Sequence, residues 1–157
     1  MKVVTVAWEP GAERFSAIGA HRGHSILVNA PESVPAPPGQ QHRAPTGFSA
    51  TELLLAGMGA CAAWDVVEIL RKQQQRLLGL EVRVEGEQES EPPWRYRRIA
   101  VLFTLRGRGL DSARARLAVR LSVDRYCSVI ATVRRGAEVV ETVEVIEATE
   151  DSARPGA

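Results

Sequence analysis

At 157 residues and 17.1 kDa, the chain has the length of one domain. Its 20 basic and 19 acidic residues give a net charge of +1, so there is no domain-wide basic field to hold nucleic acid or an anionic membrane. The longest nearly uncharged apolar run, Leu53 to Trp64, has 12 residues, whereas a membrane span needs about 20. The chain also starts without the apolar core of a signal peptide. These features predict a soluble cytoplasmic protein that binds neither nucleic acid nor a membrane.

The first part of the chain has the pattern of a small antiparallel sheet. Residues 2–8, 13–19 and 24–29 alternate apolar with polar side chains around glycine turns, which predicts a three-stranded meander. Residues 31–47 follow with five prolines and almost no apolar periodicity. We expect a loop of about 17 residues there, and loops of that length are usually functional or mobile.

A long helix is predicted next. Ser49 and Glu52 form a capping box, in which the Ser49 hydroxyl accepts from the amide three residues on and the Glu52 carboxylate reaches back to the first amide. The helix should continue to about Arg76 or Leu78. Its first half, including Trp64, is apolar on every side, which is typical of a helix enclosed by protein. We therefore expect it to be the central helix, with Trp64 in the core.

The remaining elements are a hairpin, a second helix and a last strand. Residues 80–85 and 99–105 alternate on either side of a Pro-Pro turn, which predicts a hairpin with one solvent-exposed face. Asp111 is the expected N-cap of the second helix. The apolar positions of that helix are Leu110, Ala113, Leu117 and Leu121. Residues 137–147 form the last strand, and residues 148–157 should be a disordered tail.

This element order, βββαββαβ with antiparallel pairings, predicts an α+β fold in a single domain of residues 1–147. Antiparallel sheets would wrap around the long central helix. A helix that is apolar all round needs more cover than six strands and one small helix of this chain can supply. We therefore expect a homodimer that encloses it.

Cys61 and Cys127 are the two cysteines, and three interpretations of them compete. Both could be small core residues, because free cysteine is among the most buried residue types. Metal ligation is disfavoured, because the chain has no C-x-x-C motif and its three histidines all precede Cys61. The third possibility is a redox pair, in which one thiolate attacks an oxidant and the other resolves the product as a disulfide.

The position of Cys61 determines what could activate it. The cysteine lies about 11 residues, or roughly 17 Å, past the helix start, where the helix dipole has no effect. A separate cation is needed, and Arg43 is a candidate because the six residues from it to Ser49 can span up to about 20 Å. An arginine fork would also stabilise the negative charge on a departing oxygen.

The sequence around both cysteines resembles the OsmC/Ohr family of thiol-dependent hydroperoxide reductases. The resemblance covers about residues 2–147. It is carried by residues 50–67, by Gly79-Leu80-Glu81-Val82, and by Arg120-Leu121-Ser122 with Tyr126-Cys127-Ser128-Val129. It implies an intertwined homodimer, with two central helices wrapped by sheets and active sites at the subunit interface. It also implies that Cys61 is the peroxidatic thiol, Cys127 the resolving thiol, organic hydroperoxides the substrates and a dithiol the external reductant, with no cofactor.

Two positions depart from the family pattern. Family peroxidases commonly have a glutamate ten residues before the first cysteine that orients the arginine. Thr51 occupies that position here and Glu52 follows it, so Glu52 is either a catalytic residue or only a helix cap. The arginine could be Arg43, Arg22 or Arg14.

Two functions from different classes remain open. The leading hypothesis is a peroxidase in which Cys61 becomes a sulfenic acid and Cys127 condenses with it. The second is a non-catalytic dimeric module that binds an apolar small molecule among the small residues around Cys61. Loss of two free thiols on addition of a hydroperoxide would distinguish the first from the second.

Overall fold

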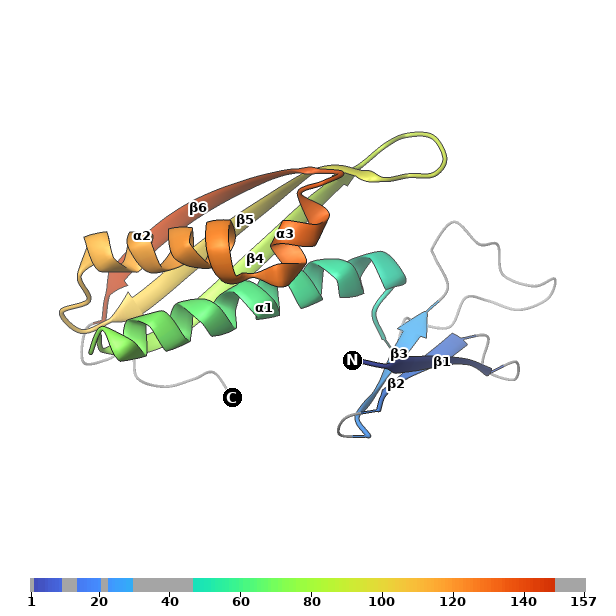
Figure 1. The fold of residues 1–157 in the computed structure, drawn as a ribbon, viewed down its shortest axis with the longest axis horizontal. Helices are drawn as coiled ribbons and strands as arrows, with labels where there is room; N and C mark the ends of the chain where they lie inside the picture. Colours follow the sequence, from blue (N-terminus) through green and yellow to red (C-terminus); the bar gives the residue numbers. More distant parts are fainter. Residues whose placement is uncertain (1, 10–13, 21–22, 30–46, 149–157) are drawn as a thin grey trace. The chain divides into compact units, whose positions relative to one another are not determined.

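The computed structural model describes residues 2–9, 14–20, 23–29 and 47–148 (Figure 1). The chain forms two compact units, Met1–Leu54 and Leu55–Ala157. The elements are a mixture of helices and antiparallel and parallel strands, which confirms the predicted α+β class. The tail after Ala148 lies outside the described residues.

The N-terminal sheet confirms the predicted meander. It contains β1 (Val4–Glu9), β2 (Arg14–Gly19) and β3 (Ser25–Asn29), paired antiparallel in that order. Trp8 lies opposite Phe15, with ring centroids 4.9 Å apart. Phe48 joins the sheet, because its N–H donates to the carbonyl of Leu27 at 3.2 Å. Most of the predicted loop, residues 30–46, lies outside the described residues.

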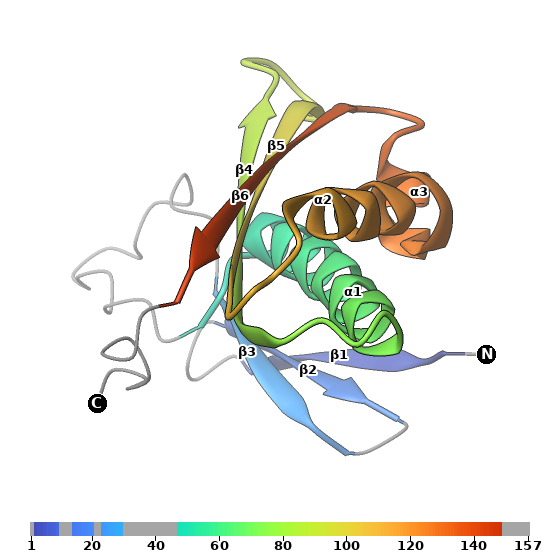
Figure 2. The ribbon, with the colours of Figure 1, turned by 90° about the vertical axis from the view of Figure 1, so that its left-hand side faces the viewer.

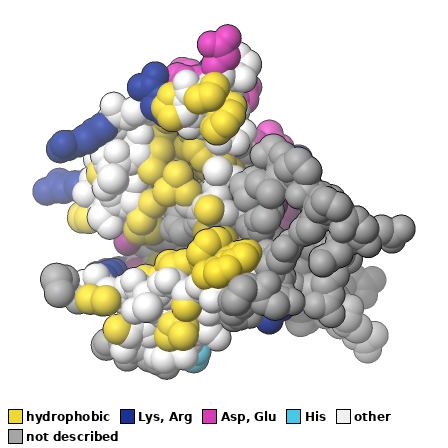
Figure 3. Space-filling model, turned by 90° about the vertical axis from the view of Figure 1, so that its right-hand side faces the viewer, with side chains coloured by type: hydrophobic (Ala, Val, Ile, Leu, Met, Phe, Trp, Pro, Cys, Tyr) yellow, Lys and Arg dark blue, Asp and Glu magenta, His cyan; other side chains and the backbone are white. Residues whose placement is uncertain are grey.

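One face of this sheet is apolar and solvent-exposed. Strand register and side-chain alternation place seven residues on it: Val4, Val6, Trp8, Phe15, Ala17, Ile26 and Val28. Of these, only Ala17 and Val28 are buried, and the large side chains are 41% to 61% exposed. Figure 3 shows such hydrophobic side chains at the surface. We call this surface the apolar face of the N-terminal sheet.

The C-terminal sheet corrects one predicted pairing. It contains β4 (Leu77–Gln88), β5 (Tyr96–Gly107) and β6 (Glu138–Glu147), and β4 pairs with β5 antiparallel as expected. β6 pairs with β5 parallel, however. The chain returns to β6 through the helices α2 (Ser112–Leu121) and α3 (Ser128–Val133), and such a crossover permits a parallel strand. All three α-helices lie on one face of this sheet (Figures 1 and 2).

The long helix α1 spans Ala50–Lys72. It ends four to six residues earlier than predicted, because the chain turns at residues 73–76 and enters β4. Every fourth side chain from Met58 to Leu70 is fully buried, so this stripe packs in the core of the C-terminal unit. By length and composition alone α1 could cross a membrane. The buried stripe, however, is typical of a helix that packs in the core of a globular domain.

The first half of α1 is not enclosed on all sides. Gly59 packs closely against β4, because an added Cβ there would lie 3.0 Å from a methyl group of Val84. On the opposite side Gly57 and Ala60 are exposed, and Trp64 is 69% exposed. Trp64 therefore lies outside the core of the C-terminal unit, and its expected core position is wrong.

The core of the C-terminal unit lies between β5 and the helices. Its β5 members are Ile99, Val101, Phe103 and Leu105, all essentially without solvent exposure. Asp111 caps α2 as predicted, accepting from the N–H groups of Ala113 and Arg114 at 2.8 and 3.0 Å. Two of the predicted apolar positions of this helix, Ala113 and Leu117, are exposed, whereas Leu110 is buried and Leu121 is half-buried. The buried residues of α2 are Ala115, Ala118 and Val119.

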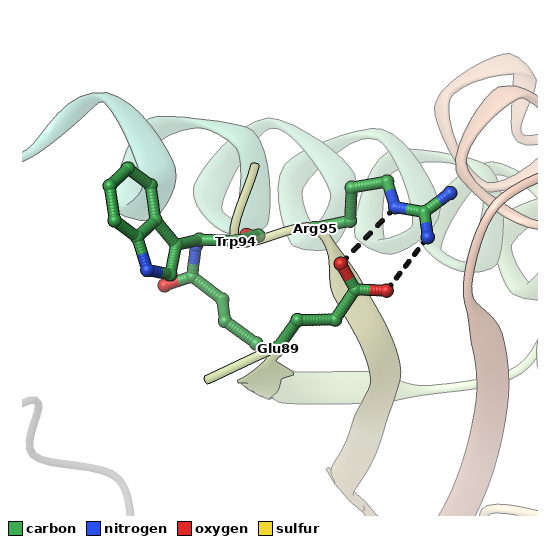
Figure 4. A network of polar contacts seen from close by, with 4 residues as sticks. Glu89, Trp94 and Arg95 are labelled. Atoms are coloured by element: carbon green, nitrogen blue, oxygen red, sulfur yellow. Dashed lines mark hydrogen bonds and ion pairs between the residues drawn. The ribbon is translucent and has the colours of Figure 1, made fainter. Parts of the chain in front are cut away.

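The solvent-exposed face of the β4–β5 hairpin is ionic. Arg95 forms a two-point ion pair with Glu89, at 2.8 and 3.3 Å, beside the exposed Trp94 (Figure 4). Arg97 pairs with Glu87 at 3.1 Å. These arginines are therefore neutralised by neighbours across the hairpin, as expected for the exposed face of a strand.

Candidate functional site

Cys127 is held at a junction between helices. α2 continues into a π-helical turn, η1 (Ser122–Tyr126), and the next residue, Cys127, is the N-cap of α3. Its sulfur accepts from the N–H of Ile130 at 3.5 Å, and its own N–H donates to the carbonyl of Ser122 at 2.9 Å. Both the turn and the cap therefore fix this side chain, and π-helical turns occur frequently at functional sites.

The fold brings the two cysteines together. Cys61 lies in the middle of α1 and is half-buried, whereas Cys127 is 2% exposed. Both are free thiols, and their sulfur atoms lie within 4.8 Å of each other. A disulfide bond is about 2.05 Å long, so the sulfurs need to move closer by no more than about 3 Å. Residues 66 positions apart in the chain thus form one candidate redox site.

The electrostatic surroundings distinguish the two thiols. The pKa of Cys127 is raised to about 11, chiefly by burial and also by the neighbouring Cys61, while the N–H groups of Ile130 and Val129 act in the opposite direction. Cys127 is therefore a protonated thiol at neutral pH. Cys61 is the more accessible of the two sulfurs.

Asp65 and Ser122 complete the cluster. A carboxylate oxygen of Asp65 lies within 4.8 Å of both sulfurs. Ser122 is fully buried, and its hydroxyl lies 3.1 Å from the carbonyl of Ala62 and 3.3 Å from Asp65 Oδ2. We call Cys61, Asp65, Ser122 and Cys127 the thiol cluster.

The sequence interpretation missed both polar members. Asp65 comes four residues after Cys61, and this spacing places two side chains on the same side of a helix. That signal could have identified Asp65. Ser122 gave no comparable signal, because its burial depends on how η1 packs against α1.

Glu52 forms the predicted capping box. Its Oε2 accepts from the N–H of Ser49 at 2.7 Å, and its own N–H donates to the Ser49 hydroxyl at 3.2 Å. The hydrogen bond from the Ser49 N–H is the main cause that lowers the pKa of Glu52. Nine helical residues separate Glu52 from Cys61, a rise of about 14 Å. Glu52 therefore does not touch the thiols, and any catalytic role would act through another residue.

The described structure tests none of the three candidate arginines. Arg43 and Arg22 lie outside the described residues, so both remain predictions. Arg14 is a half-buried residue of β2.

We do not assign the thiol cluster as a metal-binding site. Two thiols and a carboxylate are residue types that zinc also accepts. Metal binding requires both thiols to be deprotonated, and the burial that raises the pKa of Cys127 opposes this. The arrangement is better suited to chemistry between the two sulfurs.

The sequence matches the family described as OsmC-like protein over residues 41–142, a stretch that includes both cysteines. The chain belongs to this family. The OsmC/Ohr resemblance found in the cysteine motifs is thereby confirmed. Among curated proteins, protein YhfA of Escherichia coli strain K12 is 32% identical over 126 residues, which cover 80% of this chain and 86% of YhfA.

Solved structures share the fold of this OsmC-like protein. A hypothetical protein from Aquifex aeolicus has a TM-score of 0.78 and 23% identity, covering 95% of this chain and 98% of its own. An organic hydroperoxide resistance protein, OsmC, from Legionella pneumophila has a TM-score of 0.64 and 14% identity, covering 92% and 97%. At these identities the likeness establishes the OsmC fold.

Proposed function

We propose that this OsmC-like protein is a thiol peroxidase that reduces organic hydroperoxides and protects against oxidative stress. The observation that supports the proposal is that two free thiols, one accessible and one buried, have sulfur atoms within 4.8 Å of each other. The hydroperoxide resistance protein of Legionella pneumophila, which shares the fold, supports the choice of substrate.

The difference in burial supports different roles for the two cysteines. Cys61 is half-buried, so its thiolate can reach a hydroperoxide, attack the distal oxygen and release the alcohol, leaving a sulfenic acid. Cys127 is enclosed beside it and suits the resolving step. Its sulfur attacks the sulfenic sulfur, the S–O bond breaks, and a disulfide and water form. An external dithiol then reduces the disulfide and regenerates both thiols.

The proposed mechanism also requires a cation near the Cys61 thiol. The departing alkoxide carries negative charge, and a guanidinium stabilises it better than an ammonium group. We propose Arg43 for this role, with Arg22 and Arg14 as the other candidates. Glu52 would then orient the arginine from the start of α1 while it caps the helix.

The proposed active form is a homodimer in the cytoplasm. The side of α1 that contains Gly57, Ala60 and Trp64 is exposed in the single chain, and the apolar face of the N-terminal sheet is exposed as well. A second copy would cover apolar surface of this kind. Two free thiols in bridging range fit a reducing compartment, where disulfides are not maintained.

The test uses one equivalent of cumene hydroperoxide and counts free thiols by mass spectrometry. The wild-type protein should promptly lose two thiols. Cys127→Ser should stop at a Cys61 sulfenic acid that dimedone traps, and Cys61→Ser should not react. Full peroxide turnover by Cys61→Ser would exclude the mechanism. Loss of no thiol in the wild-type protein would favour a binding module for an apolar small molecule.

A further inference from the structure

We propose that Asp65 is the acid–base catalyst of the resolving step: its carboxylate takes the proton from the Cys127 thiol and passes it to the oxygen that leaves Cys61. This inference rests on the proposed function and adds a residue to it.

The resolving step needs a base. Burial, the largest cause, raises the pKa of the Cys127 thiol well above neutral, so this thiol is protonated at pH 7 when the resolving step begins. The thiolate is the nucleophile in disulfide formation. A group that removes the proton during the attack would therefore remove the main obstacle to this step.

Asp65 is placed to be that group. It lies one turn after Cys61 on α1, and its carboxylate oxygen is within 4.8 Å of both sulfurs. Several charged side chains on the neighbouring elements have other partners. On η1, Asp124 pairs with Arg134 at 3.0 Å and Arg125 lies over the Tyr126 ring. Glu68, further along α1, pairs with Arg71 at 3.0 Å.

Ser122 allows Asp65 to hold the proton. The hydroxyl has one hydrogen but lies near two acceptors, the Ala62 carbonyl at 3.1 Å and Asp65 Oδ2 at 3.3 Å. With Asp65 ionised, this hydrogen is shared between the two acceptors. With Asp65 protonated, Asp65 donates to Ser122 and Ser122 donates to Ala62, so every group has a partner. The site therefore accommodates both protonation states.

Atoms and electrons balance in the resolving step. The Cys127 sulfur lone pair attacks the sulfenic sulfur of Cys61 and forms the S–S bond. The Cys127 proton moves to Asp65, the S–O bond of Cys61 breaks, and Asp65 gives the proton to the departing hydroxide. The products are a disulfide, water and an ionised Asp65. The hydroperoxide consumed in the preceding step is the oxidant.

Single-turnover kinetics with the full-length protein test this role. Sulfenic acid formation and disulfide formation are followed separately after one equivalent of cumene hydroperoxide, across about pH 6 to 9. Asp65→Asn keeps the size of the side chain and a hydrogen bond to Ser122 but removes the base. Glu68→Gln is the matched control, because it removes a carboxylate from the same helix away from the sulfurs. Asp65→Glu tests rescue, because it keeps a carboxylate.

Asp65→Asn should form disulfide about 100-fold more slowly than Glu68→Gln at pH 7. Its rate should rise about tenfold per pH unit, because only the spontaneous thiolate reacts. Wild type, Glu68→Gln and Asp65→Glu should depend less steeply on pH. Sulfenic acid formation in Asp65→Asn should be no slower than in wild type, because the substitution removes a negative charge beside Cys61.

Slowing of less than about fivefold, or the wild-type pH slope in Asp65→Asn, would overturn the role. If Asp65→Asn does not fold, the pH slope of Asp65→Glu decides instead, and a slope of about tenfold per unit would overturn it. Failure of the proposed function looks different. In that case no Cys61 sulfenic acid forms even in Cys127→Ser.

Discussion

In the N-terminal sheet Val6 is 59% and Trp8 49% exposed, whereas in the C-terminal sheet Phe103 and Leu105 are completely buried. Both sheets have three strands, and the sequence of each alternates apolar with polar side chains. The difference is what covers them. The C-terminal sheet carries α1, α2 and α3 on its apolar face (Figure 2).

The alternation of apolar and polar side chains therefore predicts that a sheet has an apolar face, but it does not predict what covers that face. Within this chain one sheet has its layer of helices, and the other presents large apolar side chains to solvent. Soluble monomers rarely expose extensive apolar patches. The N-terminal sheet is therefore the part of the chain that most needs a second copy, in agreement with the proposed homodimer.

The two sheets should differ strongly in how much stability is lost when a phenylalanine ring is removed. Phe103→Ala removes a fully buried ring from β5 and should lower the free energy of unfolding by about 3–5 kcal/mol. Phe15→Ala, at a position 41% exposed in β2, should cost clearly less. Urea denaturation of both variants measures the difference. Equal losses would show that Phe15 is as fully covered in solution as Phe103.

A charge on the apolar face of the N-terminal sheet should weaken the proposed dimer. Val6→Glu places a charge on this face and should raise the dimer dissociation constant about 100-fold, because burying an unpaired charge is costly. Thr5→Glu is the matched control, since Thr5 points to the opposite face of β1. Sedimentation at several protein concentrations measures the constant. A monomeric wild-type protein would contradict the dimer itself.

A smaller effect is expected where α1 meets the C-terminal sheet. Gly59→Ala gains about 1 kcal/mol of helix propensity, but its Cβ would lie 3.0 Å from the Val84 side chain, and overpacking costs about 1–3 kcal/mol. We expect a net loss of about 1 kcal/mol in thermal or urea unfolding. Gly136→Ala, where an added Cβ meets no atom within 4 Å, should lose nothing. A stabilised Gly59→Ala would show that the helix and sheet are packed less closely.

The smallest effect is a pH dependence at the start of α1. Hydrogen bonds from Ser49 hold the pKa of Glu52 below 4.5. The stabilisation is therefore fully present above pH 4.5 and is lost as the pH falls through the lowered pKa. Glu52→Gln should flatten this acid-side loss in melting temperature. Asp111, whose pKa is lowered by the N–H groups of Arg114 and Ala113, should produce the same behaviour in the C-terminal unit. An unchanged acid-side slope in Glu52→Gln would contradict the capping assignment.

Much of this fold could be predicted because the deciding signals are local. The meander, the hairpin, the capping box at Ser49 and the N-cap at Asp111 each depend on side chains within a few residues of one another. The direction of β6 could not be predicted, because it depends on how α2 and α3 cross the sheet. The buried face of α2 was predicted only in part, because small residues, Ala115 and Ala118, pack there while Leu117 remains exposed.

By itself, the sequence determined most of the elements, the α+β class, the family and the two cysteines worth examining, but it did not predict η1 or α3, which flank Cys127. Only the tertiary structure decided that their sulfurs lie within 4.8 Å and that Asp65 and Ser122 join them. The physical reason is that hydrogen-bonded turns and caps are formed by neighbours in the chain. A site between α1 and the start of α3 depends instead on the packing of segments some 60 residues apart, which no local pattern encodes.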